Sequence, residues 1–69
     1  MPKKFTVVIE QDKEGWYISN VVELPGCHTQ GKTIDQLLGR TKEAIKLYLK
    51  SSKDKEIYTK FLGFHQIEV

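Results

Sequence analysis

The sequence predicts a small α+β domain with the element order β-β-β-α-(α)-β, in which a long helix packs on one face of a four-stranded, mainly antiparallel sheet. Three observations lead to this prediction. Two short segments before residue 21 have strand-like patterns, one long segment after residue 33 is amphipathic with a helical period, and glycine or proline turn signals separate the segments. The 69 residues have the length of one domain, so we assign residues 1–69 to a single domain.

The first two strands are predicted from residues 5–10 and 16–20. The first of these segments alternates in the way that is typical of a half-buried strand. The second is rich in aromatic and β-branched side chains, which favour strands. The polar segment 11–15 between them ends at Gly15 and therefore indicates a hairpin turn.

The register of this hairpin is predicted from the requirement that apolar residues share one face. The opposed pairs that meet this requirement are Glu10 with Gly15, Ile9 with Trp16, Val7 with Ile18 and Phe5 with Asn20. With this register, the residues predicted to face the helix are Phe5, Val7, Ile9, Trp16, Ile18 and Cys27. The residues predicted on the opposite face are Thr6, Val8, Tyr17, Ser19, His28 and Gln30.

A turn and a short third strand follow. Pro25 and Gly26 form a turn signal, residues 27–30 form the predicted strand, and Gly31 ends it. These three residues serve turns, which is the ordinary use of proline and glycine.

The clearest signal in the chain is a capped amphipathic helix that begins after Thr33. Thr33 is a favourable N-cap, and Gln36 stands three residues later, as a capping box requires. Asp35 in the first turn complements the helix dipole. One apolar stripe then follows at helical spacing and consists of Ile34, Leu37, Leu38, Thr41, Ala44, Ile45 and Tyr48.

Two further elements are predicted near the C-terminus. Residues 54–62 carry apolar residues at helical spacing, and Gly63 stands at the C-cap position of this short second helix. Residues 64–69 alternate and predict a final strand, which we expect to lie parallel to the first strand.

Composition and charge narrow the function classes. No apolar run approaches the roughly 20 residues of a membrane span, and the single cysteine, Cys27, excludes an intrachain disulfide and suits a reducing compartment. We therefore expect a cytoplasmic protein with no membrane contact. The core of so short a chain supplies on the order of 3–5 kcal/mol, so we also expect self-association to a dimer or tetramer.

The residues that could carry catalysis do not form a convincing site, so we expect no enzyme and no cofactor. A two-metal nuclease needs several clustered carboxylates, but Glu10, Glu23 and Asp35 are scattered along the chain. Cys27 and His28 are neighbours, and neighbouring strand residues point to opposite faces, so they cannot act as a nucleophile and base pair. Two histidines and one cysteine are too few for a structural zinc cluster.

Several motifs nevertheless resemble one family. They are Gly15-Trp16-Tyr17-Ile18-Ser19, Glu23-Leu24-Pro25-Gly26-Cys27, Thr29-Gln30-Gly31-Lys32-Thr33, Lys42-Glu43-Ala44-Ile45 and Phe61-Leu62-Gly63. Together they resemble the HicB-like antitoxins of bacteria and archaea, and the resemblance covers nearly the whole chain. The motif residues to which we give a structural role are Gly15, Leu24, Pro25, Gly26, Cys27, Gly31 and Thr33.

The resemblance implies a partial RNase H-like fold and the function of an antitoxin in a type II toxin–antitoxin system. Proteins of this family are similar in pairing with a small basic ribonuclease toxin, HicA, whose active site they mask. Longer members add a C-terminal DNA-binding domain, for which this sequence offers no segment, so no direct DNA binding is expected.

The partner-binding surface is predicted on the sheet face opposite the helix, because that face mixes apolar and hydrogen-bonding side chains. The residues assigned to it are Val8, Tyr17, Ser19, His28 and Gln30. Two alternatives remain open at this point. One is an orphan oligomeric regulatory or ligand-binding domain without a toxin, and the other is a weak RNA-binding protein that uses its lysine-bearing helix.

Overall fold

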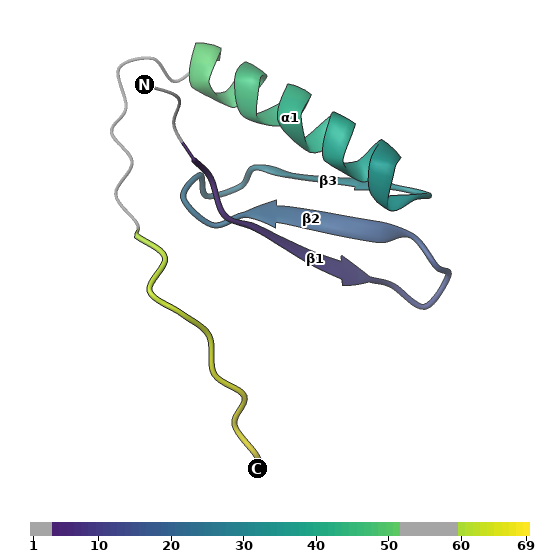
Figure 1. Cartoon of the computed structure of the whole chain (residues 1–69), viewed down its shortest axis with the longest axis vertical. Coiled ribbons are helices and arrows are strands. Elements are labelled where there is room, and N and C mark those ends of the chain that lie inside the picture. Colours follow the sequence, from purple (N-terminus) through teal and green to yellow (C-terminus); the bar gives the residue numbers. More distant parts are fainter. Residues whose placement is uncertain (1–3, 52–59) are drawn as a thin grey trace.

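The computed structural model describes residues 4–51 and 60–69 and shows three strands followed by one helix (Figure 1). The strands are β1 (Val7–Gln11), β2 (Tyr17–Val21) and β3 (His28–Gly31), and the helix is α1 (Ile34–Ser51). The strands form an antiparallel meander in the order β1-β2-β3, and α1 packs on β3 and β2. The predicted α+β class, the three-strand meander and the long helix are thus confirmed.

The β1–β2 hairpin is closed by Asp12. The Asp12 carboxylate accepts hydrogen bonds from the backbone amides of Glu14 and Trp16, each at 2.9 Å, and the Asp12 amide donates to the Trp16 carbonyl. Gly15 has a φ of 93°, which is the left-handed conformation that follows a type I turn in a hairpin loop of three residues. The turn therefore lies where the sequence predicts it, but the residues that face each other across it are Asp12 and Trp16 and not Glu10 and Gly15.

This turn changes the register of the hairpin, and the predicted register is wrong. Ile9 pairs with Ser19 instead of Trp16, which is a shift of three positions along β2. An odd shift moves every side chain of β2 to the other face of the sheet. Tyr17 and Ser19 therefore lie on the helix side, and Ile18 lies on the outer face.

The loop from β2 to β3 folds into two tight turns. The Leu24 amide donates to the Val21 carbonyl, and the Cys27 amide donates to the Leu24 carbonyl at 2.9 Å. Pro25 and Gly26 are the central residues of the second turn, and Gly26 has a φ of 84°. Proline followed by a left-handed glycine is the pattern of a type II turn. This turn leaves Leu24 and Cys27 buried on either side of it.

The N-terminus of α1 has the predicted capping box. The Thr33 hydroxyl accepts a hydrogen bond from the Gln36 amide at 3.1 Å, and the Gln36 side chain accepts one from the Lys32 amide at 2.7 Å. The bond from the Gln36 side chain runs to Lys32, the residue before the N-cap. Gln36 therefore stabilises both the first turn of α1 and the segment that leads into it.

The core lies between α1 and the β2–β3 half of the sheet. Its buried apolar residues are Val21, Leu24, Cys27 and Leu37, and the half-buried residues packed on Val21, Leu24 and Cys27 include Phe5, Val7, Ala44, Ile45, Tyr48 and Leu49. Gly31 lets the helix approach β3 closely, because a Cβ atom there would stand 2.9 Å from the Leu37 backbone nitrogen. Sheet and helix thus touch at this point through backbone.

Neither of the two elements predicted near the C-terminus is found among the described residues. Most of the predicted second helix, residues 54–59, lies outside the described residues, and residues 60–62 are not helical. The predicted final strand, residues 64–69, is not paired as a strand in the structure. Residues 60–69 instead run away from the sheet and are exposed throughout (Figure 1). Among the described helical residues, none form a helix that is long and apolar enough to cross a membrane.

Candidate protein-interaction surface

The outer face of the sheet is the face that α1 leaves uncovered. The pairing places Val8, Glu10, Ile18, Asn20, His28 and Gln30 there. A shallow hollow of about 370 Å³ lies along β2 and β3 and is lined by Ile18, His28, Thr29 and Gln30. Val8 is 42% exposed on the neighbouring strand. This face therefore combines two aliphatic side chains with groups that donate and accept hydrogen bonds.

Three of the five residues predicted to bind a partner lie on this outer face, namely Val8, His28 and Gln30. The other two, Tyr17 and Ser19, were placed there wrongly, because the hairpin register differs by an odd number of residues. Ile18 takes their place on the outer face. The apolar, β-branched side chain of Ile18 could have indicated this role in the sequence. Because β2 has apolar residues on both of its faces, however, that side chain is compatible with either face.

Ser19 is fully buried and serves the contact between sheet and helix. Its hydroxyl lies 2.7 Å from the hydroxyl of Thr41 on α1, and the Thr41 hydroxyl donates to the Leu37 carbonyl at 2.7 Å. Buried polar side chains are costly unless they are hydrogen-bonded. Ser19 therefore has a structural partner and is not accessible to a second protein in this fold.

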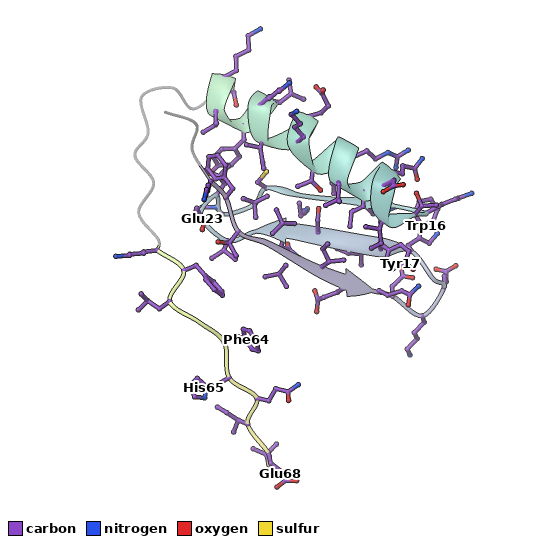
Figure 2. The ribbon with its side chains drawn as sticks, viewed as in Figure 1. Trp16, Tyr17, Glu23, Phe64, His65 and Glu68 are labelled. Carbon is purple, nitrogen blue, oxygen red and sulfur yellow. The ribbon has the colours of Figure 1, made fainter. Side chains whose placement is uncertain are left out.

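Tyr17 and Trp16 stand at the hairpin end of the sheet (Figure 2). Both side chains are half-buried, and the Lys32 ammonium lies 5.3 Å from the centre of the Trp16 ring. A cation at this distance is attracted by the face of an aromatic ring. The contact ties the hairpin to the residues that lead into α1.

Glu23 is held at the opposite end of the sheet. Its carboxylate accepts a hydrogen bond from the Thr6 amide at 2.7 Å. Partial desolvation pushes the pKa of Glu23 upward, but hydrogen bonds from Thr6 and from the backbone of Glu23 itself outweigh it and leave the pKa below its ordinary value. Glu23 therefore anchors the start of β1 as an ionised group.

Cys27 and His28 do not face each other. Cys27 belongs to the buried core, and His28 is exposed on the outer face of β3. Burial raises the pKa of the Cys27 thiol, so the thiolate that a nucleophile requires is disfavoured at neutral pH. Within residues 4–51 and 60–69, no group of three or more histidine, cysteine or acidic residues is arranged to hold a metal ion.

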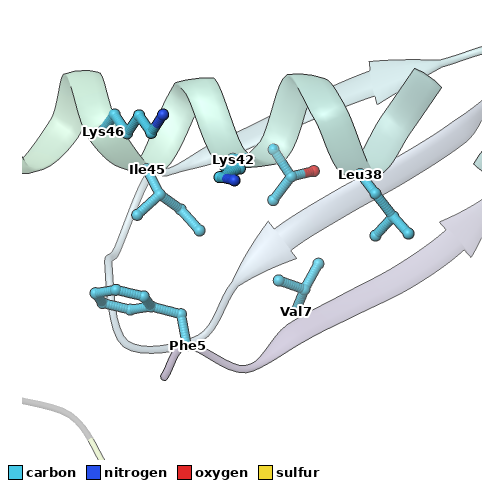
Figure 3. A pocket seen from close by; sticks show the side chains of 7 residues that line it. Phe5, Val7, Leu38, Lys42, Ile45 and Lys46 are labelled. Carbon is cyan, nitrogen blue, oxygen red and sulfur yellow. The ribbon is translucent and has the colours of Figure 1, made fainter. Parts of the chain in front are cut away.

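A second candidate surface was missed from the sequence and lies between α1 and β1. A groove of about 330 Å³ opens there, lined by Phe5, Val7, Leu38, Thr41, Lys42, Ile45 and Lys46 (Figure 3). It exists because α1 packs on β3 and β2 and does not reach over β1. Leu38 remains 46% exposed in consequence. The sequence feature that could have indicated this groove is the apolar stripe of the helix, which is wider than two strands can cover.

Comparison with known proteins shows the family. Residues 5–61 match the model of the HicB-like antitoxin of bacterial toxin–antitoxin systems. A UPF0150 protein of Archaeoglobus fulgidus is 50% identical over 66 residues, which are 96% of this chain and 94% of that protein. A UPF0150 protein of Thermoplasma acidophilum is 52% identical over 50 residues, 72% of each chain, and one of Synechocystis is 37% identical over 67 residues, 97% of this chain and 96% of that protein. This chain belongs to the HicB-like antitoxin family.

Proposed function

We propose that this chain is an antitoxin that binds a small basic ribonuclease of the HicA type and masks its active site. Membership of the antitoxin family supports a toxin partner in general. The observation that carries the proposal is the outer sheet face, where Val8 and Ile18 stand among His28 and Gln30 with no described element over them. A desolvated apolar centre with polar surroundings is typical of a protein-binding surface.

A masking mechanism fits what these side chains offer. Val8 and Ile18 can be covered by an apolar patch of the toxin, and His28 and Gln30 can hydrogen-bond to groups around its active site. No bond is made or broken, so the antitoxin inhibits by occupying the place of the RNA substrate. Glu10 at the hairpin end of this face adds a negative charge that favours a basic partner.

The test is capture of the product of a small basic reading frame beside the gene, co-expressed with this chain. We expect the two proteins to co-purify and growth inhibition by the toxin to be relieved. Val8→Asp and His28→Asp should weaken both effects, because they bring charge into the covered centre. Leu47→Asp is the matched control, since Leu47 is 66% exposed on α1, away from the sheet. Equal capture by all three variants would contradict the proposed surface.

One observation favours a second candidate function, RNA binding. Lys42, Lys46 and Lys50 are exposed at four-residue spacing and form one row along α1. A lysine row that contacts phosphates makes binding strongly dependent on salt. Fluorescence anisotropy of a labelled single-stranded RNA, measured between low and physiological salt, tests this candidate. A steep loss of binding with salt that Lys46→Gln reduces would support it over the antitoxin.

The proposed setting is the cytoplasm, with the chain self-associated. Cys27 is a free, buried thiol, which suits a reducing compartment. Self-association is supported by the small core and by the apolar groove beside β1. A partner subunit covers such surfaces in small domains that have neither disulfides nor a metal.

A further inference from the structure

β1 is one of the two edge strands of the sheet. Among the residues that the structure describes, this strand pairs with β2 alone. The Val22 amide donates to the Thr6 carbonyl, and the Asp12 amide donates to the Trp16 carbonyl, so the even-numbered residues of β1 point their backbone groups toward β2. The backbone groups of Val7, Ile9 and Gln11 therefore point to the open edge. An open row of this kind is a template for a further strand.

The groove described above runs beside that same edge on the helix side. Val7 and Ile9 direct their side chains to this side of the sheet, and Leu38 and Ile45 approach from α1 (Figure 3). Ile9 and Leu38 are 41% and 46% exposed. A strand added to β1 would place every second side chain beside Val7 and Ile9, on the face of the sheet that Leu38 approaches, and would thus remove these apolar groups from water.

The chain itself carries a segment with the properties of the missing strand. Residues 64–69 alternate, with Ile67 and Val69 on one side, and their length is that of an ordinary strand. In the structure this segment runs away from the domain (Figure 1), and none of residues 60–69 is buried. Phe64 is 86% exposed and Ile67 83% exposed. Large apolar side chains in one run rarely stay in water without a partner.

We propose that two copies of this chain form a dimer in which residues 64–69 of each copy add to the β1 edge of the other, with Ile67 and Val69 in the groove. The occupant is a second copy because the segment extends outward from its own sheet instead of folding back on it. Reciprocal exchange satisfies both edges at once and closes with twofold symmetry. The proposal gives a geometry to the self-association proposed above and does not depend on the toxin.

The first test measures the mass of the full chain by size-exclusion chromatography with light scattering across a dilution series. We expect a dimer. The double change Ile67→Asp with Val69→Asp should raise the dimer dissociation constant by at least about 100-fold, because it places charge where apolar area is buried. Leu47→Asp is again the matched control and should leave the dimer unchanged. The fold should persist in the double variant, since both residues are exposed in the single chain.

The second test distinguishes exchange from other dimers by complementation. Leu38→Asp disables the groove but keeps the segment, and Ile67→Asp with Val69→Asp disables the segment but keeps the groove. Each variant alone should be monomeric, and a mixture of the two should form a heterodimer through the one exchange that remains. A monomeric wild-type chain, a dimer that tolerates both kinds of change, or a mixture that stays monomeric would overturn the proposal. If wild-type chain is monomeric but still captures the toxin, strand exchange fails and the antitoxin proposal stands.

Discussion

The hydroxyl of Ser19 on β2 donates a hydrogen bond to the hydroxyl of Thr41 on α1 across 2.7 Å, inside the core. The direction follows from proton counting, because a threonine hydroxyl has one proton and Thr41 gives it to the Leu37 carbonyl. These two hydrogen bonds, from Ser19 to Thr41 and from Thr41 to the Leu37 carbonyl, connect the central strand to the second turn of the helix. It also shows which face of β2 belongs to the core.

Removal of one member of this pair should therefore cost more than removal of both. In Thr41→Val, the Ser19 hydroxyl loses its acceptor inside the core, and we expect a loss of about 1–3 kcal/mol in the free energy of unfolding. The double change Ser19→Ala with Thr41→Val removes both polar groups and should recover a large part of that loss. Urea unfolding of Ser19→Ala, Thr41→Val and the double variant, at one protein concentration, gives the coupling energy between the two side chains. Additive losses would contradict a buried pair.

Gly31 and Gly39 form a matched pair of glycines for a test of close packing. Gly31→Ala puts a Cβ atom 2.9 Å from the Leu37 backbone nitrogen, so helix and strand must separate, and we expect a destabilisation of about 1–3 kcal/mol. Gly39→Ala meets nothing within 4 Å on the exposed face of α1 and should stabilise by about 0.5–1 kcal/mol through helix propensity. Thermal unfolding should move in opposite directions for the two variants. Similar shifts would mean that α1 does not rest on β3 as described.

Glu23 should make stability depend on pH in the acid range. Its pKa is lowered in the folded chain below the ordinary value of 4.5, chiefly by the hydrogen bonds from Thr6 that outweigh desolvation. A carboxyl with a depressed pKa contributes stability that is fully present above its unfolded pKa and is lost as the pH falls through its folded pKa. The wild-type chain should therefore lose more stability on acidification below 4.5 than Glu23→Gln does.

The measurement for Glu23 is the urea midpoint of both proteins at several pH values. At neutral pH the variant should be the less stable of the two, because an ionised acceptor makes the stronger bond to the Thr6 amide. The gap should narrow as the pH falls. Parallel pH profiles would show that the carboxylate makes no such bond.

Cys27 should react slowly with thiol reagents as long as the chain is folded. The thiol is buried in the core, and desolvation raises its pKa above the ordinary value of 9.0. Labelling by a chromogenic disulfide reagent at neutral pH should proceed at the rate at which the core opens, and it should be immediate in urea. Rapid labelling of the native protein would place Cys27 at the surface and remove it from the core.

The sequence by itself determined the local elements. Thr33 and Gln36 bracket the helix start with polar side chains that satisfy free amides, and they do so without help from the rest of the fold. Pro25 and Gly26 likewise specify a turn that the short chain segment forms by its own backbone preferences. The motifs around them also sufficed to predict the family to which the chain belongs.

The tertiary structure alone decided which face of β2 is buried and what the C-terminal segment does. Ile18 on one side and Tyr17 and Val21 on the other make the apolar pattern of β2 compatible with two registers. The turn around Asp12 closes the hairpin in one of them, and the contact between Ser19 and Thr41, far apart in the chain, buries the matching face of β2 against α1. The alternation of residues 64–69 likewise predicts a strand, but a strand needs a neighbour for its backbone groups. Whether one is available depends on how the rest of the chain, and a second copy of it, are arranged in space.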